Sequence, residues 1–362
     1  MRRFSKIAAV ALVASLTLAG CGKDDNAKGS SAEGCSSGGD GPKVGIAYDV
    51  GGRGDRSFND SAWAGMEKAI KDLDASCTEA KAAAGENDTQ REERLRTLAD
   101  QGFNPVIAVG FIYSPAAAKV AAEFPDTKFS VIDGYSQFLT GDKQLKNLVD
   151  LTFAEEQGSY LVGVAAALKS KAKHVGFVGG THGDLIKKFE AGYTAGVKSV
   201  DPSIKIDVQY LTENPDDGEA GFENPTGGKD AATAMYEAGA DIVYHAAGKS
   251  GLGVFDAVEA AGDGKWAIGV DSDQYLTVDE AQKPHILTSM LKRIDTAVFD
   301  YVKSNADDAV EPGEKRYDLK SEGVGYSKSG GFVDDISGQL DEAAEKIKSG
   351  EIVVPTDPAK VK

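Results

Sequence analysis

The sequence predicts an α/β protein whose body has two similar lobes, each built on a parallel sheet. Short apolar runs alternate with stretches of helical periodicity throughout the chain after residue 42, which is the pattern of parallel strands joined by helices. The same order of elements begins at Val44 and again at His174. About 320 residues follow the first 42, enough for two domains of ordinary size. We therefore expect two lobes with a cleft between them.

The first strand–loop–helix unit lies at residues 44–68. Val44–Tyr48 is an apolar run typical of a buried parallel strand, and the glycines that follow it allow the backbone to turn tightly. Ser57 is expected to cap the next helix, with Asp60 as a weak capping-box partner. Strand, polar loop and helix start together form the kind of edge at which open α/β sheets bind small molecules.

Polar and aromatic side chains gather at this predicted edge. Asp49 follows the first strand, and Phe58 and Asn59 lie at the start of the next helix. Asp133 follows a later strand and is itself followed by glycine, so both aspartates are expected at the same rim of one sheet. A single aspartate in such a position is often only a turn or helix cap, but two at equivalent positions favour a site. One aromatic face with carboxylates and an amide suits a planar polar ligand rather than an anion.

The second half of the chain offers further candidates at strand ends. His245 and Gly248 follow one predicted strand, and Asp271 ends another. Gly248-Lys249-Ser250 resembles the end of a P-loop, but the glycine that the pattern needs five residues earlier is Val243. We expect Gly248 to present backbone amides to a neutral ligand, Asp271 to bind hydroxyls, and His245 either to face the ligand or to serve as a capping or core residue. The histidines lack metal-ligand spacing, so the sequence predicts no metal and no cofactor.

The first twenty residues predict a lipoprotein signal peptide. Three basic residues precede the apolar run Ile7–Leu18, which is too short for a stable membrane span. Leu18-Ala19-Gly20-Cys21 is typical of a bacterial lipobox and makes Cys21 the acylated first residue of the mature protein; the alternative is an ordinary signal peptide with an incidental cysteine. Residues 21–42 are rich in glycine, serine and other polar residues and predict a flexible tether. The protein is thus expected at the extracytoplasmic face of the cell membrane, held by its lipid.

Cysteine usage and charge agree with an exported protein. Once Cys21 is acylated, Cys35 and Cys77 remain as an even pair, and an oxidising compartment would allow them to form a disulfide. The signal peptide holds three of the 40 lysines and arginines and no acidic residue, so the mature chain has 37 basic and 57 acidic residues and a formal charge of −20. This acidity argues against nucleic acid and anionic membrane surfaces as partners.

The elements late in the sequence predict that the chain returns to each lobe once more. We assign residues 43–153 and 286–320 to the N-terminal lobe, and residues 154–285 and 321–355 to the C-terminal lobe. The chain then crosses between the lobes three times.

Several short motifs follow one another along the mature chain. They are Asp49–Gly52, Asp55–Asn59, Trp63–Gly65, Ser159–Gly163, Val175–Gly180, Lys188–Gly192, His245–Gly248, Gly269–Gln274 and Thr288–Lys292. Together they resemble the basic membrane protein (BMP) lipoproteins, the PnrA-like group that binds purine nucleosides, over essentially the whole mature body. The resemblance implies a type I periplasmic-binding-protein fold, with two Rossmann-like lobes joined by a three-segment hinge. It also implies delivery of a purine nucleoside to an ABC transporter permease.

The same resemblance implies a role for each candidate residue. Aromatic rings would stack on the base, and polar groups would bond the base edge and the ribose. The implied assignments are Phe58 and either Tyr244 or His245 for stacking, Asn59 and Asp133 with support from Asp49 for the base edge, and Asp271 and Lys292 for the ribose hydroxyls.

The charges of this set favour a nucleoside over a nucleotide. Carboxylates outnumber the single lysine, Lys292, so they would repel a phosphate, whereas they accept hydrogen bonds from ribose diols and exocyclic amines. Other functions stay open: a sugar-binding lipoprotein of the same fold, a surface sensor or interaction lipoprotein, and a nucleoside-cleaving enzyme. The enzyme would need a metal-ligand cluster that the sequence does not contain, and we therefore expect a binding protein.

Overall fold

The computed structural model describes residues 34–35, 39–83, 85–141 and 143–361. The chain divides into two units, one that ends at Gly34 and one that begins at Cys35. All that follows concerns the second unit. The predicted signal peptide, the predicted acylation site Cys21 and most of the predicted tether lie outside the described residues. Within the described ranges, helices are too short or too polar to cross a membrane.

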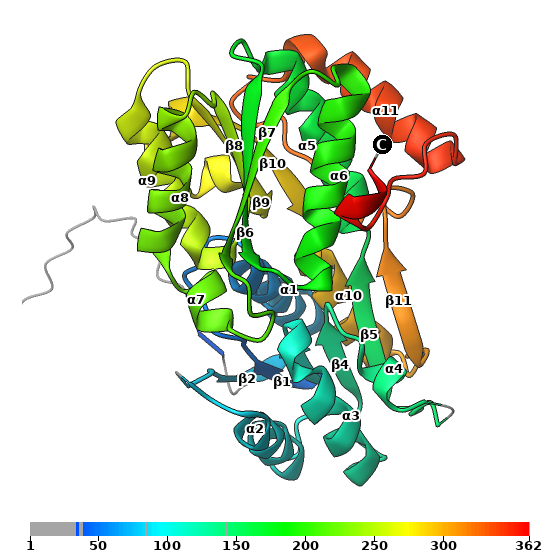
Figure 1. Cartoon of the computed structure of the whole chain (residues 1–362). Coiled ribbons are helices and arrows are strands. Elements are labelled where there is room, and N and C mark those ends of the chain that lie inside the picture. Colours follow the sequence, from blue (N-terminus) through cyan, green and yellow to red (C-terminus); the bar gives the residue numbers. More distant parts are fainter. Residues whose placement is uncertain (1–33, 36–38, 84, 142, 362) are drawn as a thin grey trace, which may run out of the picture. The chain divides into compact units, whose positions relative to one another are not determined.

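The strands of the second unit form two six-stranded sheets with the same internal order (Figure 1). The order is β2-β1-β3-β4-β5-β11 in the first sheet and β7-β6-β8-β9-β10-β12 in the second. All neighbours are parallel except β10 and β12. The strands are β1 (Lys43–Ala47), β2 (Ser76–Ala80), β3 (Val106–Val109), β4 (Phe129–Ile132), β5 (Leu148–Phe153), β6 (His174–Thr181), β7 (Lys205–Thr212), β8 (Ile242–Ala246), β9 (Trp266–Asp271), β10 (Ile286–Lys292), β11 (Gly313–Tyr317) and β12 (Val324–Tyr326).

Helices cover both faces of each sheet, as the predicted α/β class requires. One face of the first sheet packs against α2 and α3 and the other against α1 and α10; one face of the second packs against α8 and α9 and the other against α5, α6 and α11. The helices are α1 (Phe58–Leu73), α2 (Asp88–Asp100), α3 (Ser114–Glu123), α4 (Ser136–Leu139), α5 (Glu155–Lys169), α6 (Asp184–Val200), α7 (Gly218–Phe222), α8 (Pro225–Glu237), α9 (Gly251–Ala261), α10 (Ile294–Ala306) and α11 (Ser337–Ser349).

The strand order places a site-forming crevice in each sheet. In the first sheet the chain runs from β1 to β2 on one side of β1, and then from β2 to β3 on the other side of β1. Ligands of open α/β sheets bind at such a reversal, beyond the carboxyl ends of the strands. In the second sheet β6 occupies the equivalent position, between β7 and β8. The residues just after β1, β3, β4, β8 and β9 are therefore the ones that the fold brings to a common edge.

One boundary of the predicted lobes is wrong. Ile286–Lys292 was expected in the N-terminal lobe, but it forms β10, which pairs with β9 in the second sheet. The chain crosses only after Lys292, since α10 packs against α1 and β11 pairs with β5 in the first sheet. β10 is buried along nearly its whole length, as a central parallel strand is, but an apolar run does not say which neighbour it will pair with.

A disulfide joins the start of the second unit to the first sheet. Cys35 and Cys77, the pair proposed from the sequence, are linked with a Cα–Cα distance of 4.9 Å. Cys77 lies in β2, a polar strand at the sheet edge. The disulfide therefore holds Cys35 beside this edge strand.

Candidate functional site

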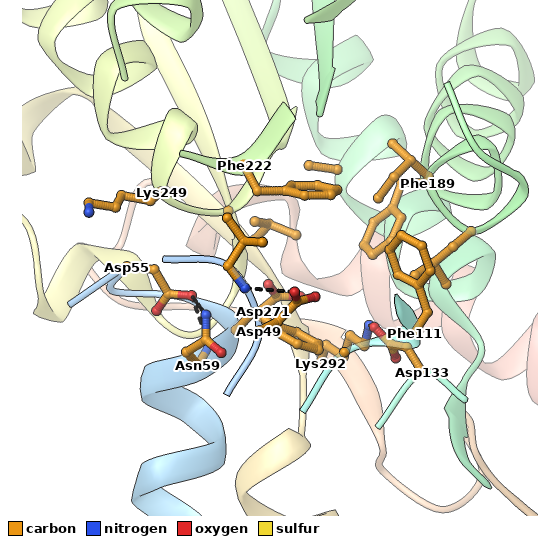
Figure 2. Close-up of a pocket in the computed structure, with 18 residues that line it drawn as sticks. Asp49, Asp55, Asn59, Phe111, Asp133, Phe189, Phe222, Lys249, Asp271 and Lys292 are labelled. Carbon is orange, nitrogen blue, oxygen red and sulfur yellow. Dashed lines mark hydrogen bonds and ion pairs between the residues drawn. The ribbon is translucent and has the colours of Figure 1, made fainter. Parts of the chain in front are cut away.

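A cavity between the two sheets is lined by residues from both lobes (Figure 2). It encloses about 640 Å³ of empty space, part of it open to solvent. The structure brings together all the predicted ligand-binding residues except His245. Those lining the cavity are Asp49, Phe58, Asn59, Asp133, Gly248, Asp271 and Lys292.

Asp133 and Asp271 occupy equivalent places in the two lobes. Asp133 directly follows β4 and Asp271 ends β9, and each adopts a left-handed backbone conformation, with φ of 60° and 63°. Such a conformation is uncommon for residues other than glycine, and aspartate tolerates it better than most. Both carboxylates thus turn away from the strand direction and into the cavity.

Lys292, at the end of β10, is the charged centre of the site. Its side chain is buried, and Nζ lies 2.5 Å from Asp133 Oδ2 and 3.3 Å from Glu155 Oε1. Burial alone would lower the pKa of Lys292, but the carboxylates of Asp133, Glu155 and Asp271 outweigh that effect and raise it, so the ammonium stays charged. Burial raises the pKa of Asp133 to about 6 even though Lys292 lowers it. The ammonium also lies 5.2 Å from the centre of the Phe58 ring.

Asp49 lies beyond β1, next to a glycine that makes room for it. Its Oδ1 accepts a hydrogen bond from the backbone N–H of Val50 at 2.6 Å. A Cβ added to Gly110, which follows β3 with φ of 113°, would lie 2.2 Å from Asp49 Oδ2. Burial raises the pKa of Asp49 to about 7. Near neutral pH this carboxyl group can therefore accept or donate a hydrogen bond.

The start of α1 differs from the prediction. Ser57 makes no capping hydrogen bond to the helix; instead its Oγ donates to Asp271 Oδ2 at 2.7 Å, across the two lobes. Asp55 takes the capping role, because its carboxylate accepts from the backbone N–H groups of Ser57, Asn59 and Asp60. Asp60 does not complete a box with Ser57 and accepts from the backbone of the preceding glycine-rich loop.

His245 does not line the cavity, and neither does Tyr244. The His245 side chain is fully buried against Phe255, and its Nε2 lies 3.1 Å from Gln274 Oε1. Burial lowers the pKa of His245 to about 4, so the ring is neutral. Tyr244 points to the opposite face of β8, where its hydroxyl meets Ser159. Of the two alternatives stated for His245, the core role is the one that the structure has.

Three aromatic residues that were not expected from the sequence line the cavity instead. They are Phe111 after β3, Phe189 in α6 and Phe222 at the end of α7. In Figure 2 the rings of Phe189 and Phe222 lie on one side of the cavity, with Asn59, Asp49 and Asp271 on the other. Phe189 belongs to the motif Lys188–Gly192, but helical periodicity alone does not separate a cavity-facing ring from a core ring. Phe222 lies in a stretch rich in asparagine, aspartate, proline and glycine, which gives no sign of a helix end at a cavity.

The cavity combines apolar walls with hydrogen-bond acceptors that have no partner. Asn59 Oδ1 and Asp133 Oδ1 are buried and lack a hydrogen-bond partner among the described residues. Gly248 begins a tight turn at the rim, and the neighbouring Lys249 pairs with Glu223 at 3.2 Å. The described part of the chain holds no cluster of three or more potential metal ligands. The arrangement suits a flat ligand that carries hydrogen-bond donors along its edges.

A model of the Bmp family, described as PnrA-like ABC transporter substrate-binding proteins, matches residues 43–358. The chain belongs to this family. It is therefore a substrate-binding protein of ABC transporters, a class that binds a small molecule and works with a transporter, and not a member of an enzyme family.

Relatives and solved structures agree with this assignment. The CD4+ T-cell-stimulating antigen of Listeria monocytogenes is 34% identical over 87% of this chain and 88% of the relative. The ABC transporter nucleoside-binding protein BmpA of Lactococcus lactis is 32% identical over 98% of this chain and 99% of the relative. A solute-binding protein of an ABC transporter system from Aeropyrum pernix superposes with a TM-score of 0.74, at 26% identity over 87% of this chain and 94% of that one. The fold is thus the type I periplasmic-binding-protein fold that the sequence predicts.

Proposed function

We propose that this family member binds purine nucleosides in the cavity between its lobes and delivers them to the permease of an ABC importer. The observation that carries the proposal is a cavity in which aromatic rings from both lobes accompany carboxylates, while its lysines are already paired. Phe58 comes from the first lobe, and Phe189 and Phe222 from the second. A base between such rings gains roughly 1–3 kcal/mol for each stacking contact, by analogy with single-stranded nucleic acids.

Charge favours a nucleoside without phosphate. Lys292 is paired with Asp133 and Glu155, and Lys249 with Glu223, so neither cation is available to neutralise a phosphate without breaking an existing pair. In this proposal Asp271 and Lys292 bond the ribose hydroxyls, and Asn59, Asp133 and Asp49 bond the base edge. The name of the Lactococcus lactis relative, a nucleoside-binding protein, agrees with this ligand class.

Calorimetric titration tests the ligand class. The chain from Gly22 onward keeps the whole described unit and can be titrated with adenosine, guanosine, inosine, uridine, ribose and AMP. We expect micromolar or tighter binding of purine nucleosides, about −8 kcal/mol or better, with much weaker binding of AMP and ribose. Phe58→Ala should weaken nucleoside binding by roughly tenfold or more. Binding of ribose alone, or equally tight binding of AMP, would contradict the proposal.

We also propose that Cys21 carries the lipid that holds the protein at the extracytoplasmic face of the cell membrane. The lipobox-like sequence before Cys21 supports this assignment. Detergent phase partitioning of the protein from expressing cells tests it, since an acylated protein enters the detergent phase. Cys21→Ser should move the protein to the aqueous phase, whereas a variant that stayed in the detergent phase would show that another feature anchors it.

A further inference from the structure

Asp55 holds the side chain of Asn59 as well as the start of α1. Asp55 is 2% exposed, and its Oδ2 accepts from the backbone N–H of Asn59 at 2.8 Å and from the side-chain Nδ2 at 3.2 Å. Its Oδ1 accepts from the backbone N–H groups of Ser57 and Asp60. Figure 2 shows the Asp55 carboxylate directed at the Asn59 amide. The carboxylate is therefore fixed by bonds on both of its oxygens.

This contact determines which end of the Asn59 amide faces the ligand. A carboxylate offers only acceptors, so the amide group must turn its NH₂ toward Asp55, and the reverse orientation would set two oxygens against each other. The amide oxygen is then left for the cavity. Asn59 is 4% exposed and lines the cavity, and its Oδ1 has no partner among the described residues.

A buried acceptor of fixed orientation requires the ligand to place a hydrogen-bond donor against it. A ligand that places an N–H group against Asn59 Oδ1 satisfies the acceptor, whereas one that places a C–H group there leaves it unpaired at a cost of about 1–3 kcal/mol. Sites built to hydrogen-bond a polar group reject analogues that lack the group for this reason. Asp55 also lines the cavity, but both of its oxygens already accept hydrogen bonds from the chain. The free acceptor is therefore on Asn59, and the preference depends on Asp55 through the orientation of the Asn59 amide.

We propose that Asp55 is a positioning residue that fixes Asn59 as an acceptor, and that the site therefore selects nucleosides whose base carries an N–H donor. The inference rests on the proposed nucleoside function and defines its ligand class further. Adenosine carries an exocyclic amine and inosine carries a ring N–H, so both meet the demand. Purine riboside has the same rings and ribose but no N–H on its base, and it does not.

Calorimetry of the chain from Gly22 onward with these three nucleosides tests the selection. We expect purine riboside to bind roughly 10- to 100-fold more weakly than adenosine and inosine. Purine riboside binding within threefold of both would overturn the inference while leaving the nucleoside function standing. An absence of binding by all three would overturn the nucleoside function, and this inference with it.

Variants separate positioning from a merely structural role. Asn59→Ala removes the acceptor and should weaken adenosine roughly tenfold while leaving purine riboside nearly unchanged. Asp55→Asn presents an NH₂ group that allows the Asn59 amide to reverse, so the affinity ratio of adenosine to purine riboside should fall toward one. Asp60→Asn is the matched control, because Asp60 caps the same loop without lining the cavity, and its ratio should match the wild type.

The ratio, rather than either affinity alone, is the decisive readout. If Asp55 only stabilised the fold, Asp55→Asn would weaken both ligands by the same factor and leave the ratio unchanged, which would overturn the inference. If Asp55→Asn fails to fold, Asn59→Ala still tests the inference. An equal loss of affinity for adenosine and purine riboside would show that Asn59 does not distinguish bases with an N–H donor from bases without one.

Discussion

The carboxyl groups of three residues that line the cavity make the stability of the protein depend on pH. Burial raises the pKa of Asp49 to about 7 and those of Asp55 and Asp133 to about 6. A raised pKa means that the folded state holds the proton more tightly than the unfolded state does. The stability that each protonated group contributes is therefore complete below the unfolded pKa, near 4, and is lost as pH rises through the folded value.

Asp49→Asn should stabilise the protein at high pH and not at low pH. Asparagine can still accept the Val50 N–H bond but carries no charge to bury, so the gain should be roughly 1–3 kcal/mol at pH 8. At pH 4.5 the wild-type carboxyl group is already protonated in the folded state, and the gain should nearly vanish. Urea unfolding at both pH values measures it. A gain that did not change with pH would show that burial of the Asp49 charge does not raise its pKa.

Lys292→Met should destabilise the fold strongly, because it leaves the buried Asp133 without its counter-charge, whereas Glu155 keeps Lys188 at 3.2 Å. Breaking such a buried pair costs roughly 3–5 kcal/mol. Lys249→Met removes a lysine from a more exposed pair with Glu223 and should cost about 1 kcal/mol or less. Urea unfolding of both variants compares the costs. Equal costs would show that Lys292 is not the electrostatic centre of the site.

The sequence predicts the polar residues of the site better than its aromatic residues. Asp49, Asp133 and Asp271 could be selected because they follow apolar strands, and strand ends meet at one edge of a parallel sheet. Phe189 and Phe222 could not, because α6 and α7 turn them toward the cavity only once the second lobe has formed. The core position of His245 and the contact of Asp55 with Asn59 likewise depend on tertiary packing.

Among the elements, α5 and α6 pack so closely that their backbones nearly touch. A Cβ on Gly192 of α6 would lie 2.2 Å from the backbone oxygen of Glu156 in α5. Neighbouring glycines of the same pair, Gly163 and Gly196, are equally confined by backbone. Small residues permit this close packing, and Glu155, at the start of α5, pairs with Lys188 of α6 and with Lys292 of β10.

Gly192→Ala should therefore destabilise the protein by roughly 1–3 kcal/mol, the usual cost of overpacking. Gly338→Ala is the matched control, because Gly338 lies in α11 and a Cβ there would meet nothing within 4 Å. That variant should be neutral, or more stable by up to about 1 kcal/mol, since alanine favours helix. Thermal or urea unfolding of the pair distinguishes them, and a harmless Gly192→Ala would refute the close approach of the two helices.

Two edge strands of the first sheet cannot be recognised from the sequence. β2 (SCTEA) and β11 (GEKRY) lie at the two ends of the first sheet and are polar, as edge strands that must avoid pairing with other molecules are. Neither contains an apolar run, so neither was expected as a strand. The sequence assigns residues 286–292 to the wrong lobe, because the neighbours of β10 are decided by the path of the whole chain.

At the scale of the whole molecule, the disulfide joins Cys35, within the predicted tether, to the first sheet. Cys35 and Cys77 are 42 positions apart, and closing a loop of that length stabilises a protein by about 4 kcal/mol in the chain-entropy account. Replacing both cysteines with serine should remove roughly 2–4 kcal/mol of stability and leave nucleoside affinity unchanged, because neither cysteine lines the cavity. Urea unfolding and calorimetry of the double variant test the two halves of this prediction, and a loss of affinity would contradict the second.

The two-lobed organisation can be predicted because the same order of strands and helices occurs twice along the sequence. Each lobe repeats the same strand order, and each receives its last strand from a late return of the chain. The lobes meet through hydrogen bonds of Ser57 with Asp271 and of Gln274 with the backbone of Arg56. Such contacts between residues more than 200 positions apart have no local signal in the sequence.

A crystal structure of the protein grown with adenosine tests the central proposal most directly. It should show the base in the cavity between the two sheets, against Phe58 and with an N–H group on Asn59 Oδ1, and the ribose at Asp271 and Lys292. Adenosine bound elsewhere on the protein, or an empty cavity at saturating adenosine, would contradict the proposed site and the proposed ligand together.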